Sequence, residues 1–345
     1  MKKLSILLVL ALLMVSAVPA WAAEWSFSGW AQTENSYGKA GLTADDAHEY
    51  ELQIRLTASA QVSDQTSFVY QIRTLGYYDD NGVYGDGSGH TNPRTNGDNV
   101  RTRLAYITTN LTDNLSITMG KNAYWLAGGL LMDDFIRGIG MNYKLADNLS
   151  LFALAGNYES NPKIQVYAAA LNGNFGGFDL GLTVLGSNDT IQGDAKAKAN
   201  GTSKPYDGTL IYAVNAGYNV AKNLNLSMAY ATNSNSESAW ETSDDKNVAY
   251  KVQLGYSGIE KAGIYLQYFA QDTYMMWPTE TGNHMGWWGD MYGRTTGING
   301  FRLIYEQKLT DNVGLALCYG KYEFNDSTIS NESLTKATVG MNISF

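Results

Sequence analysis

The sequence predicts an all-β fold, a transmembrane antiparallel up-and-down β-barrel of about sixteen strands with short turns at one end and long loops at the other. Three observations predict it. Apolar and polar residues alternate over long stretches, tight turns alternate with long polar connections, and the last strand ends on an aromatic residue. Alternation with a period of two places apolar side chains on one face of a strand and polar ones on the other.

The longest alternating stretch runs from His48 to Val62. Its fifteen residues exceed the length of a strand in a soluble protein, which is roughly 5–6 residues. The same pattern recurs within 208–220, 224–233 and 247–258. A soluble β-sandwich or propeller is the competing fold, but it needs bulky residues packed into a core. Here we expect small polar residues to line one face all the way round, which favours the barrel.

The connections fall into two sets that alternate along the chain. The tight set carries Asp-Asn or Lys-Asn pairs and glycines that suit turns, at 63–65, 112–114, 146–148, 176–177, 221–223, 260–261 and 310–312. The long set is polar, at about 34–47, 77–98, 123–134, 159–163, 189–207, 234–246, 273–294 and 325–333.

These connections delimit the predicted strands. They lie near 24–33, 48–62, 66–76, 99–111, 115–122, 135–145, 149–158, 164–174, 178–188, 208–220, 224–233, 247–258, 262–272, 295–309, 313–324 and 334–345. A strand of ~12 residues tilted by ~45° climbs roughly 28 Å, which matches the ~25 Å apolar band of such barrels. The strand near 149–158 alternates poorly. Tyrosines near strand ends suit an interfacial girdle, namely Tyr143, Tyr158, Tyr230, Tyr256, Tyr305 and Tyr319.

The first residues predict export. Lys2 and Lys3 precede an apolar run from Leu4 to Val18, and Ala20-Trp21-Ala22 reads as a cleavage site. We therefore expect a signal peptide over 1–22 and one barrel domain over 23–345; a retained anchor is the alternative. Cleavage removes two of the 24 basic residues and no acid, so the net charge moves from -9 to -11 (22 minus 33). This acidic balance excludes nucleic acid as a partner.

The chain ends with Val339, Met341, Ile343 and Phe345 on one strand face. This ending resembles the last strand of Gram-negative outer-membrane proteins, in which a final aromatic residue is recognised by the barrel-assembly machinery. With the leader and the strand count, the whole mature chain resembles the sixteen-stranded trimeric general diffusion porins.

That resemblance implies Sec export, an outer-membrane location, a homotrimer among lipid and lipopolysaccharide, and passive diffusion of ions and small hydrophilic solutes. A substrate-specific channel and a barrel that acts mainly as a structural anchor or adhesin are the alternatives. The polar, glycine-rich face argues against the anchor, because a plugged barrel needs filler.

The resemblance also implies a constriction, made by a third long loop that folds into the lumen. The matching segment runs from Ala123 to Asp134, with a glycine pair for a bend and the acidic pair Asp133 and Asp134, but it is short and apolar. A basic wall is expected to face it, formed by Arg55, Arg73, Arg101 and Arg103, with Arg302 on the same strand parity. Charges of opposite sign across a narrow water column would favour polar solutes. Alternatively, these arginines only solvate the lumen or pair with Glu49 and Glu51.

No catalytic or metal-binding arrangement is found, so we expect neither an enzyme nor a cofactor. The three histidines, His48, His90 and His284, lack metal-ligand spacing, and no Ser/His/acid grouping falls on adjacent strands. Ca²⁺ could bind the loop segments 79–82 and 86–89, although such Gly/Asp stretches are more often solvated tips. The Met- and Trp-rich segment 273–294 would be either the lip of a specific channel or a loop packed on itself. Cys318 has no partner for an intrachain disulfide and fits a small filler position.

Overall fold

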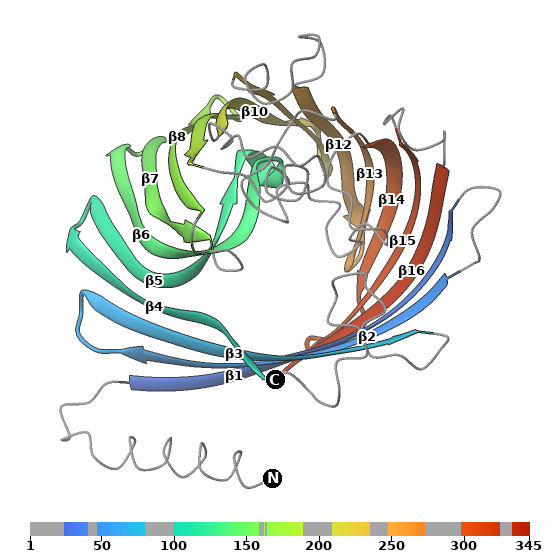
Figure 1. Cartoon of the computed structure of the whole chain (residues 1–345), viewed down its shortest axis with the longest axis horizontal. Helices are drawn as coiled ribbons and strands as arrows, with labels where there is room; N and C mark the ends of the chain where they lie inside the picture. Colours follow the sequence, from blue (N-terminus) through green and yellow to red (C-terminus); the bar gives the residue numbers. More distant parts are fainter. Residues whose placement is uncertain are drawn as a thin grey trace, which may run out of the picture.

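The computed structural model describes residues 24–40, 47–79, 100–158, 162, 164–188, 209–234, 248–272, 298–324 and 333–345. These form sixteen antiparallel strands, each hydrogen-bonded to its neighbours in sequence, and β1 closes the ring by pairing with β16 (Figure 1). The predicted up-and-down barrel is confirmed. Within the described part of the chain, no helix is long and apolar enough to cross a membrane.

The strand boundaries lie close to the predicted ones, with larger differences at β1 and around residues 123–134. The strands are β1 Glu24–Ala40, β2 Ala47–Gln61, β3 Thr66–Asp79, β4 Arg101–Thr112, β5 Leu115–Leu126, β6 Met132–Ala146, β7 Leu149–Tyr158, β8 Gln165–Phe175, β9 Phe178–Ser187, β10 Thr209–Ala221, β11 Leu224–Asn233, β12 Val248–Ile259, β13 Ala262–Gln271, β14 Ile298–Lys308, β15 Val313–Phe324 and β16 Ser333–Ser344. One short 3-10 turn, η1, spans Ala127–Gly129.

Several sequence-based expectations fall outside the described residues. They are the signal peptide at 1–22, His90 and His284, the Met- and Trp-rich segment 273–294, and the candidate Ca²⁺ segments, of which only the backbone of Asp79 at the end of β3 is described. Among the described residues, no group of three or more His, Cys, Asp or Glu side chains is placed to hold a metal ion.

The tight turns at one end of the barrel depend on backbone conformations with positive φ. Gly176 and Gly177 adopt φ of 62° and 90° between β8 and β9, and Asn223 adopts 66° between β10 and β11. Asparagine adopts a positive φ more readily than most residues, which fits its position in the predicted turn. Lys261 also adopts it, with φ of 57°, and no turn chemistry in the sequence indicates that.

The outer face of the barrel is apolar and the inner face of most strands is polar. Exposed outward side chains include Phe27, Leu182 and Val339, whereas glutamines such as Gln32 and Gln267 are buried on the inside. This is the inside-out pattern that a barrel surrounded by lipid requires. Four of the six predicted girdle tyrosines are exposed on the outer strand faces: Tyr143, Tyr230, Tyr256 and Tyr319. Tyr158 was predicted wrongly, because it is 1% exposed inside the barrel.

The seam between β1 and β16 is fastened by the last residue. The backbone N–H of Gly29 donates to the carbonyl oxygen of Phe345 at 2.6 Å, and the N–H of Phe345 donates back to Gly29 at 2.9 Å. The aromatic ring lies directly over Gly29, where a Cβ atom would approach ring atom Cε2 to 2.1 Å. Glycine at position 29 is therefore what lets the terminal ring lie against the seam.

Candidate pore constriction

The end of the β5–β6 hairpin leaves the barrel wall and lies inside it. The β4–β5 ladder stops at Lys121 and the β6–β7 ladder starts at Ile136, while β5 and β6 stay paired with each other as far as Leu126 and Met132. In Figure 1 this hairpin tip lies within the ring of strands, and η1 contacts β9, β10 and β11. The expected loop over 123–134 is thus wrong in form, because the strands continue through most of it.

Only the tip of this hairpin is a true turn. Gly128 and Gly129 adopt φ of 64° and 77°, so the glycine pair does make the tight bend that the sequence indicated. Ala127 beside them also has a positive φ, of 51°. The bend reverses the chain within residues 127–131 and presents the apolar side chains of the tip to the barrel wall.

A row of three glycines lies where the hairpin turns inward. Gly120 pairs with Gly138, and Gly138 pairs with Gly156 on β7. A Cβ atom on Gly120 would lie 2.2 Å from the carbonyl oxygen of Ala105, and one on Gly138 would lie 2.2 Å from that of Ala155. The backbones approach too closely for any side chain, and Gly120 also has φ of 127°. Sequence reasoning missed this row; its signal is one glycine at the same level in three consecutive strands.

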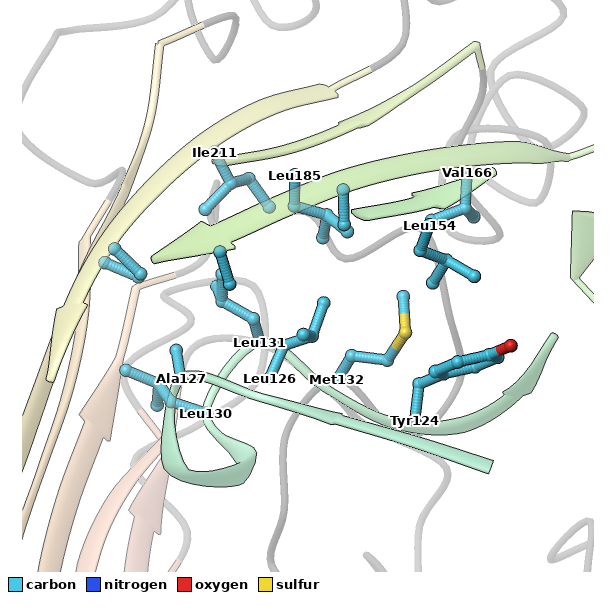
Figure 2. Close-up of a cluster of buried hydrophobic side chains, with 14 of the residues drawn as sticks. Tyr124, Leu126, Ala127, Leu130, Leu131, Met132, Leu154, Val166, Leu185 and Ile211 are labelled. Atoms are coloured by element: carbon cyan, nitrogen blue, oxygen red, sulfur yellow. The ribbon is translucent and has the colours of Figure 1, made fainter. Parts of the chain in front are cut away.

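The hairpin packs on the inner wall through a continuous apolar cluster (Figure 2). Leu131 and Met132 from the tip are 0% exposed, and they pack among side chains of β7 to β10: Leu154, Val166, Leu185 and Ile211. Burying each large apolar side chain contributes roughly 1.5–3 kcal/mol. Alanines on the wall leave room for the tip: Ala168, Ala170, Ala213, Ala229, Ala231 and Ala249.

This cluster corrects the expectation that small polar residues line the inner face all the way round. On β7 to β11 the inner face is largely apolar because it receives the hairpin rather than water. The polar inner face is found on the remaining strands, where Gln32, Gln53, Gln267 and Thr338 are buried inside the barrel. The barrel interior therefore has an apolar half that holds the hairpin and a polar half.

The hairpin tip is also tied to β12. The Lys251 ammonium donates a hydrogen bond to the carbonyl oxygen of Gly128 and lies 5.8 Å from the centre of the Trp125 ring. The Trp125 indole covers Gly129, since a Cβ atom on this glycine would come within 2.4 Å of the ring. Trp125 itself is 58% exposed. Trp125 is thus the large side chain that the hairpin turns away from the wall.

The base of the hairpin carries two cations beside one aromatic ring. Arg103 and Lys121 lie 4.9 Å and 5.6 Å from the ring centre of Phe135. Arg103 donates to the side-chain oxygen of Gln71 at 2.9 Å, and Lys121 donates to the backbone carbonyl of Thr102. Such contacts hold the charged groups near the ring while leaving their charge intact.

Three of the predicted wall arginines form one cross-strand row. Arg55 on β2 pairs with Arg73 on β3, and Arg73 pairs with Arg101 on β4. Arg55 lies 4.1 Å from the ring centre of Trp30 and donates to the side chain of Gln53. The β3–β4 ladder skips Arg103, so this residue occupies a bulge and reaches the hairpin base instead.

The other predicted site residues lie apart from that row. Arg302 on β14 is 6% exposed and donates to Gln267, and three strands (β15, β16 and β1) separate it from β2. Asp133 and Asp134 belong to the hairpin, where their backbones pair with Trp125 and Tyr124. Their side chains lie outside the described part of the structure, so the acidic constriction stays a prediction.

The structure is therefore a closed sixteen-stranded barrel with a hairpin docked inside it and a row of arginines on its inner wall. No family model matches the chain, and no curated protein matches it in sequence. Solved structures do match its fold. Salmonella typhi OmpF in complex with daunomycin aligns with a TM-score of 0.60 and 15% identity, over 95% of this chain and 99% of that one.

Two further structures show the same likeness. The anion-selective porin from Comamonas acidovorans aligns with a TM-score of 0.61 and 9% identity, over 94% of this chain and all (100%) of that one. OmpT, an outer membrane protein of Vibrio cholerae in its trimer form, aligns with a TM-score of 0.57 and 13% identity, over 94% and 100%. At these identities the comparisons establish the fold.

Proposed function

We propose that this chain forms a water-filled channel in the outer membrane of a Gram-negative bacterium, for passive diffusion of ions and small hydrophilic solutes. One observation carries the proposal: Arg55, Arg73 and Arg101 occupy the inner face of a barrel whose outer face is apolar, and each of them is at least partly exposed to solvent. Charges inside a membrane-embedded barrel are stable when water reaches them. Sixteen strands are enough to leave an aqueous channel.

The assembly and the route to the membrane belong to the same proposal. We propose Sec export with removal of residues 1–22, folding by the barrel-assembly machinery, and a homotrimer surrounded by outer-membrane lipid and lipopolysaccharide. The matched Vibrio cholerae protein is an outer membrane protein in trimer form, which supports this assembly. The polar and charged side chains on the inner wall favour a channel over an enzyme.

The direct test is conductance of the purified protein in planar bilayers. We expect it to fractionate with the outer membrane, to resist SDS until heated, and to give large, weakly selective conductance steps, because water fills the polar half of the lumen. A small step blocked by a single solute would indicate a substrate-specific channel instead. Recovery as a soluble periplasmic monomer would contradict the barrel, and an inserted barrel without steps would contradict both kinds of channel.

A second prediction concerns the acidic pair of the hairpin. Asp133→Asn together with Asp134→Asn is expected to shift ion selectivity toward anions. The two substitutions remove fixed negative charges from a narrow section of the pore, where salt screens charges poorly. The reversal potential under a KCl gradient measures the shift. Asp113→Asn with Asp147→Asn, in exposed turns, is the matched control. An unmoved reversal potential would place the pair outside the narrow section.

A further inference from the structure

We propose that the pore carries a binding site for neutral polyhydroxylated solutes, such as sugars, on the inner wall of β7 to β10 at the turn end of the barrel. The inference rests on the proposed channel function and names a substrate class for it. It starts from a change along the inner wall. On β8 and β10 the apolar cluster that holds the hairpin ends at Ala170 and Ala213, and the next inward positions toward the turns are Asn172 and Asn215.

Asn172 and Asn215 lie in one cross-strand row with a glycine between them. Gly181 on β9 pairs with Asn172 on β8 and with Asn215 on β10. The amide of Asn215 lies over this glycine, since a Cβ atom there would come within 2.2 Å of Oδ1 of Asn215. The glycine therefore leaves the space that the side-chain amide occupies.

A second row lies nearer the turns. Asp179 on β9 pairs with Asn174 on β8 and with Gly217 on β10. The Asn174 amide donates a hydrogen bond to Oδ1 of Asp179 at 2.7 Å, which orients the carboxylate. The two rows thus place three amides and one carboxylate around wall positions that carry no side chain.

These polar residues line a cavity of about 400 Å³. Binding sites for small molecules measure roughly 300–1,000 Å³, so the cavity accommodates a sugar-sized solute. A solute can reach the polar groups, because Asn172, Asn174 and Asp179 are exposed and Asn215 is half-buried. Ser150 on β7 adds an exposed hydroxyl group to the lining.

The chemistry of this lining matches hydroxyl groups. An asparagine amide donates through its NH₂ group and accepts through its oxygen, and a sugar hydroxyl also does both. Neighbouring amides can therefore pair with neighbouring hydroxyl groups of one solute. The carboxylate of Asp179 adds an acceptor, and hydrogen bonds to a charged acceptor are the stronger ones.

The same lining favours a neutral solute over an ion. Lys144 and Asp147 at the rim form an ion pair of 2.7 Å, so their charges offset each other. Asp179 is the remaining charged residue of the lining. A Ca²⁺ ion takes roughly 6–8 oxygen ligands, with carboxylates among them, and one carboxylate among amides offers it little charge.

The position of the cavity gives it a place on the permeation path. The short turns of outer-membrane barrels face the periplasm, so a solute that has passed the hairpin meets this wall at the periplasmic exit. A permeating solute must bind weakly enough to leave again. The exposure of the lining fits weak binding of this kind, in the millimolar range.

The experiment measures saturation transfer by NMR from the purified protein to glucose, in micelles of a detergent without a sugar headgroup. We expect the glucose protons to gain saturation, with half-saturation at millimolar glucose. A polyethylene glycol of similar size is the matched probe, because its ether oxygens accept hydrogen bonds but do not donate them. It should gain much less saturation than glucose.

Asn172→Ala with Asn215→Ala should raise the glucose concentration at half-saturation several-fold, because the variant loses both amides of the first row. Asn219→Ala with Asn225→Ala is the matched control. These two amides hydrogen-bond to each other at 3.2 Å on the same inner wall, outside the cavity. Their removal should leave glucose binding unchanged.

Gly181→Ala tests the same row without removing a polar group. It should displace the Asn215 amide and weaken glucose binding, whereas Gly217→Ala, with its nearest atom 3.7 Å from the new Cβ, should retain it. Heat-dependent migration in SDS gels verifies that each variant folds. If Gly181→Ala fails to fold, the Asn172 and Asn215 double variant still decides the question.

The possible failures are distinguishable. A protein that conducts ions but transfers no saturation to glucose would overturn the sugar site and leave the channel function standing. Equal saturation of glucose and polyethylene glycol would overturn recognition of hydroxyl groups. Glucose binding that survives loss of Asn172 and Asn215 would overturn its assignment to this wall. Glucose binding to an inserted barrel that gives no conductance would instead overturn the channel and leave the site.

Discussion

Replacing residues 124–134 by an Asn-Gly turn is expected to raise single-channel conductance several-fold and to admit larger solutes. Ala123 and Phe135 are already paired, so a two-residue turn can join them without moving the wall. The variant removes the hairpin tip and exposes the apolar inner face of β7 to β11 to the lumen. Conductance in planar bilayers and uptake of sized sugars into liposomes measure the effect.

Trp125→Ala is the matched control for this deletion. It trims the exposed side chain of the hairpin but keeps Leu131 and Met132, which hold the tip on the wall. We expect a smaller rise in conductance than the deletion causes. Heat resistance should fall in the deletion, because its apolar cluster is lost, and change little in Trp125→Ala. Equal conductance of the deletion variant and the wild type would mean that the hairpin does not limit the pore.

Removing Phe345 is expected to abolish most assembly into the outer membrane. The truncation deletes both backbone hydrogen bonds to Gly29 at the seam and the ring that covers this glycine. The closing seam of a barrel must stay hydrogen-bonded, because an open sheet edge leaves unsatisfied backbone groups in lipid. The measurement is the yield of SDS-resistant protein in outer-membrane fractions. Molecules that do insert should conduct like the wild type.

Two glycine-to-alanine substitutions distinguish an effect at the terminal ring from a general effect of adding a side chain to the seam. Gly29→Ala should displace the terminal ring, since a Cβ atom there would lie 2.1 Å from it, and so reduce the yield. Gly340→Ala lies on β16 of the same seam, where the nearest atom to a new Cβ is 3.6 Å away, and should be tolerated. Normal yields of both the truncated protein and Gly29→Ala would refute a role for the terminal residue in closure.

Local sequence determined the barrel. A period of two over long stretches specifies strands with one lipid-facing side. The Asn- and Gly-containing turns specify where the chain reverses. Most strands from β2 to β16 therefore begin and end within a few residues of the predicted positions. The parity of Arg55, Arg73 and Arg101 was also readable, because side-chain direction within a strand depends only on position. These features are local, and each is encoded within about a dozen residues.

The destination of the β5–β6 hairpin was decided only by tertiary structure. Strand 149–158 alternates poorly because both of its faces contact apolar surroundings: the outer face carries Leu151 and Ala153, and the inner face carries Phe152 and Leu154 against the hairpin. An apolar side chain gives the same sequence pattern whether it contacts lipid or another strand. That ambiguity is why Tyr158 was assigned to a girdle instead of the cluster.

The arginine row shows the same division. Parity places each arginine on the inner face, but the pairing of Arg55 with Arg73 and of Arg73 with Arg101 follows from the register between strands. The register of β2 with β3 is set across the tight turn at 63–65, and that of β3 with β4 includes the bulge at Arg103, which no single strand encodes. Alternation therefore determined which side chains enter the barrel, whereas pairing across strands and the inward bend at Gly120, Gly138 and Gly156 decided which of them meet, because those contacts join residues far apart in the chain.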